Sequence, residues 1–177
     1  MLYFVTALKP EAQAIVEKYR LSKSRCGSFV FFESKDIKVI VSGIGVESSK
    51  KATDALIEHF NPGDDDVFIN IGICGADKKY NIGELIKIGS IIYNDDLHVL
   101  DNAVSTVLTC KDNEISDNIH DIVDMESFGF YKACAKMKNR RIYKVVSDHF
   151  EPQKVTKDGA KKLIFDIIDK VVIEEQN

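Results

Sequence analysis

The sequence contains no tryptophan, only three prolines, and no apolar stretch long enough to span a bilayer. Its first residues, "MLYFVTALKPEAQ", lack the basic segment and small-residue cleavage site of a secretory signal, so we expect a cytoplasmic protein without a membrane anchor. It also lacks a block of lysine and arginine, and its net charge of -4 gives no electrostatic footprint for nucleic acid. The expected partner is therefore a small neutral or polar molecule.

Cysteine is scarce as well, and the four that occur are scattered: Cys26, Cys74, Cys110 and Cys134. They form no C-x-x-C pair and have no histidine at ligand spacing, so the pattern indicates neither a zinc site nor a disulfide framework. We expect no metal and no cofactor, and we expect most of these thiols to be buried.

What the chain does have is the composition of an ordinary globular protein. It is 177 residues long, 45% hydrophobic and 29% charged. A chain of this length can bury a substantial core, and it fits a single domain over residues 1–177.

Strand-like and helix-like segments alternate along most of the chain. Helical spacing of apolar residues follows Pro10, recurs over 47–60, continues through Tyr131 and Met137, and returns from about Thr156. The β-rich runs cover 2–7, 28–34, 36–43, 66–73, 88–94, 104–110 and 141–148. This alternation predicts an α/β fold, a three-layer α/β/α domain with a mixed central sheet.

Acidic residues follow several of the predicted strands. Glu11 comes after the first strand, Glu126 lies in the segment "IVDMESFGF" (122–130), and Asp148 ends the last strand. Each has a simpler explanation, because acids favour the first helical turn and aspartate favours turns. Ligands of open α/β sheets, however, bind at the carboxyl ends of the strands, so the three acids together predict one cleft. For the neighbouring Asp124 we expect a capping or solvent-facing role.

Glycines mark two further strand ends, Gly43 and Gly45 in "GIGV" and Gly72 and Gly75 in "GICGA". Such turns allow a ligand to approach the backbone closely. Position 48 is serine, so G-x-G-x-x-G is not completed, and "GICGADKK" lacks the ending of a P-loop. These glycines therefore indicate neither of the common nucleotide-binding loops.

In order along the chain, four segments resemble the purine nucleoside phosphorylase and nucleosidase superfamily. They are "VTALKPEAQAI", the long stretch from "VIVSGIGVESS" to "IKIGSII", "IVDMESFGFYKAC" and "YKVVSDHFEP". The chain is most similar to the methylthioadenosine/S-adenosylhomocysteine nucleosidase branch, and the resemblance covers nearly its whole length. No single segment is specific to this superfamily, but the four segments in this order are.

The resemblance implies roles for individual residues. Glu11 would orient and deprotonate an attacking water, and Asp148 would protonate or hydrogen-bond the leaving purine. Met125 and Glu126 would hold the ribose, with Glu126 accepting hydrogen bonds from its hydroxyls. Further substrate contacts are implied at Gly75, Ile115 and Ser147.

The chain also departs from the family pattern. Ile73 stands where a small hydroxyl residue is usual, and the first loop offers Lys9 where a phosphorylase has arginine, so hydrolysis is favoured over phosphorolysis. The segment 94–122 is short, and Glu114 takes the place of an aromatic residue that stacks on the base. We expect a nucleosidase and consider a homodimer as its assembly. The alternatives are a phosphate-dependent phosphorylase and a relative that binds a nucleoside without cleaving it.

Overall fold

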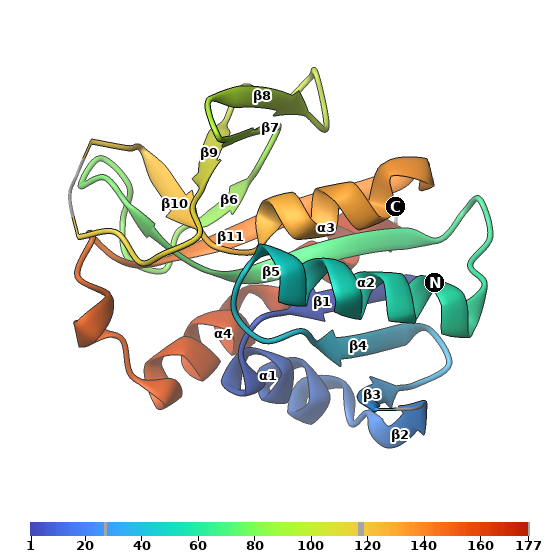
Figure 1. Ribbon diagram of the computed structural model, residues 1–177. Coiled ribbons are helices and arrows are strands. Elements are labelled where there is room, and N and C mark those ends of the chain that lie inside the picture. The colour runs from blue at the N-terminus through green and yellow to red at the C-terminus, as the bar shows by residue number, and fades with distance from the viewer. Residues whose placement is uncertain (27, 117–118, 177) are drawn as a thin grey trace.

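The computed structural model describes residues 1–26, 28–116 and 119–176, and its strands form one sheet that runs through the molecule (Figure 1). The strands are β1 (Leu2–Thr6), β2 (Ser22–Cys26), β3 (Phe29–Glu33), β4 (Ile37–Val41), β5 (Val67–Ala76), β6 (Leu85–Lys87), β7 (Ser90–Tyr93), β8 (Asp96–Val99), β9 (Val107–Cys110), β10 (Ile122–Asp124) and β11 (Asn139–Asp148). The helices are α1 (Lys9–Tyr19), α2 (Val46–Phe60), α3 (Ser127–Ala133) and α4 (Lys157–Gln176), with short 3-10 turns η1 (Cys134–Lys136) and η2 (Pro152–Lys154).

The middle of the sheet is parallel and its edges are antiparallel. The strands β4, β1, β5 and β11 run parallel to one another, and β2, β3 and β4 form an antiparallel meander at one edge. Beyond the carboxyl end of β5 the sheet continues through β10, β9, β7 and β8. This confirms the predicted α/β fold with a mixed sheet.

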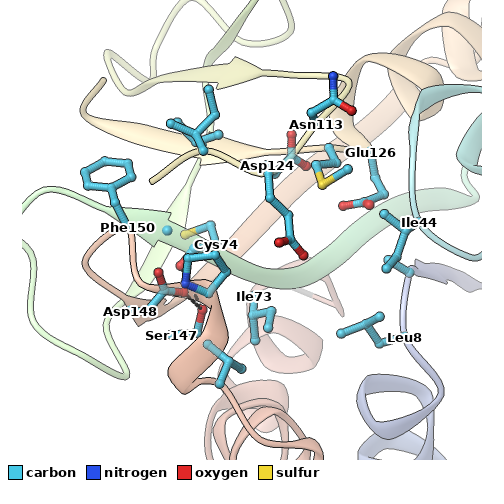
Figure 2. Close-up of a pocket in the computed structure, with 18 of the residues that line it drawn as sticks. Leu8, Ile44, Ile73, Cys74, Asn113, Asp124, Glu126, Ser147, Asp148 and Phe150 are labelled. Atoms are coloured by element: carbon cyan, nitrogen blue, oxygen red, sulfur yellow. Dashed lines mark hydrogen bonds between the residues drawn. The ribbon is translucent and has the colours of Figure 1, made fainter. Parts of the chain in front are cut away.

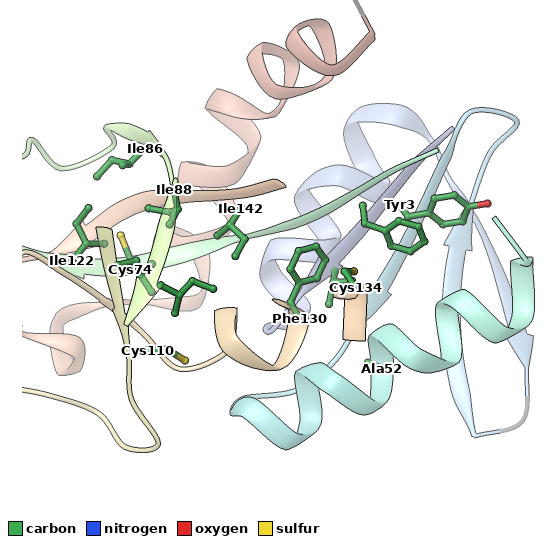
Figure 3. Close-up of a cluster of buried hydrophobic side chains, with 14 of the residues drawn as sticks. Tyr3, Ala52, Cys74, Ile86, Ile88, Cys110, Ile122, Phe130, Cys134 and Ile142 are labelled. Carbon is green, nitrogen blue, oxygen red and sulfur yellow. The ribbon is translucent and has the colours of Figure 1, made fainter. Parts of the chain in front are cut away.

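Helices cover both faces of the parallel strands. Helices α1 and α4 pack together on one face, and α2 and α3 pack together on the other (Figure 1). Because successive side chains of a strand point to opposite faces, neighbouring residues belong to different cores. Tyr3 and Phe68 lie in the core under α2 and α3, whereas Phe4 and Ile69 lie in the core under α1 and α4. Part of the first core, with Phe130 of α3, is drawn in Figure 3.

Several elements differ from the sequence-based expectation. The polar segment "SKSRC" forms β2, and the ambiguous segment after β7 forms β8. The helix expected to run through Met137 ends at Ala133 and is followed only by the turn η1, because the chain must reverse direction before β11.

The expected burial of the thiols is observed for Cys74, Cys110 and Cys134. The side chain of Cys26 lies outside the part of the chain that the structure describes. Among the described residues, no helix combines the length and the apolar character needed to cross a membrane.

Candidate active site

A cavity of about 240 Å³ opens at the carboxyl ends of the central strands. It is lined by residues that follow β1, end β5, follow β10 and end β11 (Figure 2). All seven residues predicted to form the site lie around it: Glu11, Gly75, Ile115, Met125, Glu126, Ser147 and Asp148. The fold therefore brings together side chains that are up to 137 positions apart in the sequence (148 − 11).

Glu11 is held rigidly at the start of α1. Its Oε2 accepts a hydrogen bond from the Leu8 backbone N–H at 2.8 Å, and its Oε1 accepts one from the Ile73 N–H of β5 at 2.9 Å. The side chain is only 1% exposed. Burial raises the pKa of Glu11, and the backbone donors oppose that rise only in part. A carboxylate so placed is a stronger base than one in water.

A glycine makes room for this carboxylate. A Cβ atom at position 72 would lie 3.0 Å from Glu11 Oε1, so any larger residue there would press on the acid. The turn predicted at Gly72 is wrong, because the residue lies inside β5 and pairs with Lys144; its role is to leave space for the Glu11 side chain.

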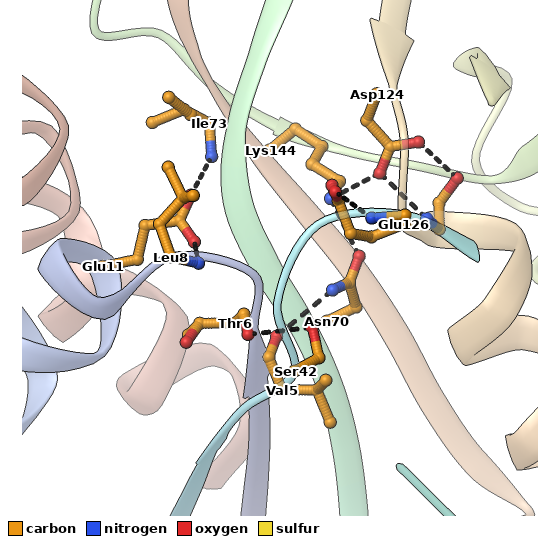
Figure 4. A network of polar contacts seen from close by, with 12 residues as sticks. Val5, Thr6, Leu8, Glu11, Ser42, Asn70, Ile73, Asp124, Glu126 and Lys144 are labelled. Carbon is orange, nitrogen blue, oxygen red and sulfur yellow. Dashed lines mark hydrogen bonds and ion pairs between the residues drawn. The ribbon is translucent and has the colours of Figure 1, made fainter. Parts of the chain in front are cut away.

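Glu126 lies across β5 from Glu11, beside the buried ion pair of Asp124 and Lys144 (Figure 4). Its Oε1 accepts a hydrogen bond from the Gly45 N–H at 3.0 Å. Burial raises the pKa of Glu126 to about 7; the Asp124 carboxylate adds to the rise and Lys144 opposes it. Gly45 reaches this position with φ of 100°, which glycine adopts more readily than other residues. Glu126 therefore joins the amino-terminal ends of α2 and α3.

Beneath Glu126, Lys144 of β11 and Asp124 of β10 form an ion pair with an N–O distance of 2.7 Å. Each of these two side chains is 1% exposed. Lys144 also donates to Asn70 Oδ1 at 2.8 Å, and Asp124 accepts from the hydroxyl and the backbone N–H of Ser127. Burial alone would lower the pKa of Lys144, but the surrounding carboxylates, Asp124 foremost, raise it. Lys144 therefore stays positively charged below the cavity.

Two sequence-based interpretations are tested here. The capping role expected for Asp124 is confirmed, because it accepts from the first N–H of α3, but the solvent-facing alternative is wrong, because the side chain is buried against Lys144. The alternative role of Glu126 as a helix cap does not hold, because its side chain bonds to Gly45 across the cavity wall and not to α3.

Asp148 closes β11 at the end of the cavity away from Glu126 (Figure 2). Its Oδ1 accepts a hydrogen bond from the Glu151 N–H at 2.8 Å, which confirms the prediction that Asp148 closes a turn. Its Oδ2 lies 2.7 Å from the Ser147 hydroxyl, which lies 3.1 Å from the Cys74 carbonyl. One hydroxyl hydrogen can serve only one of these acceptors, so Ser147 can turn toward either group. His149 points away and its Nδ1 lies 2.9 Å from the Ala76 carbonyl.

Apolar residues that the sequence did not suggest complete the wall. Leu8 and Ile44 lie at the end near Glu126, and Phe150 lies at the end near Asp148 (Figure 2). Ile44 is 54% exposed in this structure, and exposed apolar side chains at a cavity mouth are typical of binding sites. A motif search could not find these residues, because they are ordinary apolar positions in loops.

The described charged side chains that line the cavity are all acidic. Among the described residues that line it, none is lysine or arginine, and five are acids: Glu11, Glu114, Asp124, Glu126 and Asp148. Glu114 and Ile115 come from the loop between β9 and β10, whose described residues offer the cavity no aromatic ring. Such a lining favours a ligand that is neutral or gains positive charge, and disfavours a phosphate.

The fold is that of the nucleoside-cleaving enzymes, as comparison with solved structures shows, although no family model matches the chain. A methylthioadenosine/S-adenosylhomocysteine nucleosidase from Helicobacter pylori, solved with butyl-thio-DADMe-Immucillin-A, superposes with a TM-score of 0.81 at 16% identity, covering 98% of this chain and 97% of that one. The Arabidopsis thaliana methylthioadenosine nucleosidase gives 0.75 at 19% identity, covering 96% and 95%.

Futalosine hydrolase of Helicobacter pylori is similar to the same degree, with a TM-score of 0.75 at 15% identity over 96% of this chain and 97% of that chain. The sequence resemblance and the structural likeness thus lead to the same group of proteins. At these identities the likeness establishes the fold, and the chemistry must be argued from the cavity.

Proposed function

We propose that the protein is a nucleosidase that hydrolyses the N-ribosidic bond of a purine-type nucleoside, releasing the free base and the sugar. The observation that carries the proposal is the convergence of Glu11, Glu126 and Asp148 on one cavity. The compared structures support it, since their names describe nucleosidases and a futalosine hydrolase. A methylthioadenosine-like or an S-adenosylhomocysteine-like nucleoside is the substrate that the resemblance favours.

The proposed reaction uses the two ends of the cavity. The base lies toward Asp148, which gives a proton to the base, at N7, as the bond to the sugar breaks and its electron pair stays with the base. The ribose lies toward Met125 and Glu126, whose carboxylate accepts hydrogen bonds from the hydroxyls. Glu11 holds a water and takes its proton while the water oxygen bonds to the anomeric carbon. Each proton and electron pair is thereby accounted for.

The acidic lining suits this chemistry. Breaking an N-ribosidic bond builds positive charge on the sugar, and groups that are fixed before the reaction stabilise such charge best. Glu11 is fixed by two backbone donors and Glu126 by the Gly45 N–H, so neither has to reorganise when the charge develops.

The test is an assay of base release from a panel of purine nucleosides, with and without phosphate, by the wild type and by Asp148→Asn. We expect the wild type to release base without phosphate, and the variant to be slower by roughly 10²- to 10⁴-fold, because general acid help is worth about that much. Equal rates for the two proteins would contradict the assignment of Asp148 as the proton donor. Strict dependence on phosphate would make the protein a phosphorylase, and tight binding without release would make it a nucleoside-binding relative.

We also propose that the protein is a homodimer of the cytoplasm, without nucleic-acid or membrane partners. Support for the dimer comes from apolar residues exposed on β8 and at the start of β9, namely Leu97, Val99 and Val107. Support for a reducing compartment comes from the buried free thiols of Cys74 and Cys110.

A further inference from the structure

One buried aromatic residue belongs to neither hydrophobic core. Seven aromatic side chains are buried among the described residues: Tyr3, Phe4, Phe31, Phe68, Phe130, Tyr143 and Phe150. The first six belong to the two cores described above. Phe150, which is 5% exposed, belongs to neither and faces the cavity instead. Core packing therefore does not account for its burial.

Phe150 is also held in a conformation that phenylalanine rarely adopts. Its φ is +61°, in the left-handed region, where a bulky side chain crowds the backbone. The turn that holds it is closed by Asp148, whose Oδ1 accepts from the Glu151 N–H at 2.8 Å. Strained residues of this kind persist where the surroundings over-determine them, most often at functional sites. The proposed proton donor and Phe150 are thus positioned by the same turn.

The ring lies beside Asp148 and Gly75. A Cβ built at Gly75 would lie 3.5 Å from Asp148 Oδ1 and 3.5 Å from Phe150 Cδ1, so the carboxylate and the ring border the same space above the glycine. Figure 2 shows Phe150 at the Asp148 end of the cavity, away from Glu126. Among the described residues that line the cavity, Phe150 is the single aromatic one.

We infer that Phe150 supplies the aromatic contact for the leaving base and so determines which ligands bind at the Asp148 end. The inference rests on the proposed nucleoside function and adds to it an aromatic contact that Asn113, Glu114 and Ile115, the described loop residues lining the cavity, do not supply. The ligand it selects is a neutral, planar heteroaromatic base, because such a base can pack its π face or edge against the ring. A bare sugar or an aliphatic amide offers no such surface.

The inference is tested by measuring the binding of adenine, hypoxanthine and guanine calorimetrically to the wild type, Phe150→Leu and Phe150→Tyr. We expect Phe150→Leu, which keeps apolar bulk but loses the ring, to bind at least one base about 5- to 100-fold more weakly, because base–aromatic contacts are typically worth that much. Phe150→Tyr keeps the ring and should retain most of the affinity. Phe165→Leu is the matched control, since Phe165 is exposed on α4 outside the cavity, and it should bind as the wild type does.

A readout on the wild type avoids any effect of substitution on folding. With a base bound, nuclear Overhauser contacts are expected between its ring protons and the ring protons of Phe150. A bound base without these contacts would refute the inference. So would wild-type affinity in Phe150→Leu, equal losses in Phe150→Leu and Phe150→Tyr, or a wild type that binds none of the three bases.

The two proposals fail in different ways. If the wild type binds a base through Phe150 but releases none from any nucleoside, the hydrolase function is wrong and the base contact stands. If the wild type releases base and Phe150→Leu binds that base unchanged, the function stands and the role of Phe150 is wrong.

Discussion

At the scale of single residues, Glu126 shows how one group can couple binding to stability. It is 7% exposed, and burial followed by the Asp124 carboxylate raises its pKa from 4.5 to about 7. Between these two values the folded protein binds a proton that the unfolded chain releases. Stability contributed by this proton is fully present below pH 4.5 and is lost as the pH rises through about 7.

We therefore predict that the wild type loses stability from pH 5 to pH 8 relative to Glu126→Gln, by on the order of 1 to 3 kcal/mol. Glutamine cannot ionise and can still accept from the Gly45 N–H. Denaturant titrations of both proteins across this range measure the difference. Parallel stability curves would show that Glu126 ionises as an ordinary surface acid does.

Ligand binding should follow the opposite trend. The proposed ribose contact requires the ionised carboxylate, so nucleoside affinity of the wild type should rise with pH through about 7. Glu126→Gln should bind about 10- to 100-fold more weakly, since hydrogen bonds to charged groups contribute about 1.5–3 kcal/mol. Its affinity should also vary less with pH, and an unchanged pH profile in the variant would contradict the assignment.

The residues of the site differ in how readily the sequence predicts them. Glu11, Glu126 and Asp148 could be predicted because strand ends and a family pattern both mark them. Lys144 was missed, although a lysine inside the apolar run "IYKVVS" is a signal, because a buried charge requires a partner. No sequence pattern marks Phe150 as a site residue, since its role depends on a turn whose geometry only the fold determines.

At the scale of elements, the site depends on how closely α2 and α3 approach. A Cβ at Gly129 of α3 would lie 2.0 Å from the Val46 carbonyl oxygen and 3.0 Å from the Lys50 nitrogen of α2. The first distance is far shorter than a normal contact and the second is tight, so only glycine allows the helices to pack this way. The hydrogen bond from Gly45 to Glu126 joins the same two helices.

We predict that Gly129→Ala destabilises the protein by about 1 to 3 kcal/mol, the usual range for overpacking, although alanine favours a helix by about 1 kcal/mol. Nucleoside binding should weaken too, because the helices must move apart at Glu126. Urea unfolding measures the first effect and calorimetry the second. Gly159→Ala in α4 is the control, since its Cβ would lie 3.0 Å from the Thr156 hydroxyl oxygen that accepts from the Gly159 N–H, and would meet no backbone atom of another element; similar losses in both variants would refute the argument.

Most elements could be predicted from periodicity, and the exceptions have physical causes. The strands of the parallel core are mostly apolar because helices cover both faces, although β5 carries Asn70 and β11 carries Lys144. β2 was missed because its residues are polar, and it forms only by pairing with β3. β6 is three residues long, too short for a pattern, and pairing with β11 defines it.

At the scale of the whole molecule, one edge of the sheet exposes apolar residues that can pair with a second chain. β8 ends the sheet, and Leu97 on it is 60% exposed, with Val99 at 41%. Exposed apolar edge strands pair with other chains unless they are blunted by charge or covered.

We predict that the wild type sediments as a dimer and that Leu97→Lys sediments as a monomer, because a lysine exposed on an edge strand opposes pairing. Ile82→Lys places the same charge at a residue that is 52% exposed outside β8 and β9, and should leave the dimer intact. Sedimentation velocity at several concentrations is the measurement. A wild type that is monomeric throughout, or equal dissociation of both variants, would overturn this prediction.

The hydrogen bond from the Ile73 N–H to Glu11 should open far less often than hydrogen bonds in the loops around the cavity. Its donor lies in β5, where β11 pairs along one side and Glu11 itself covers the other. Amide hydrogens in such central strands exchange with solvent only through openings close to global unfolding, whereas loop amides exchange through local fluctuations. The bond that orients Glu11 should therefore stay closed through local fluctuations that open loop amides, so the proposed general base would keep its orientation toward the cavity.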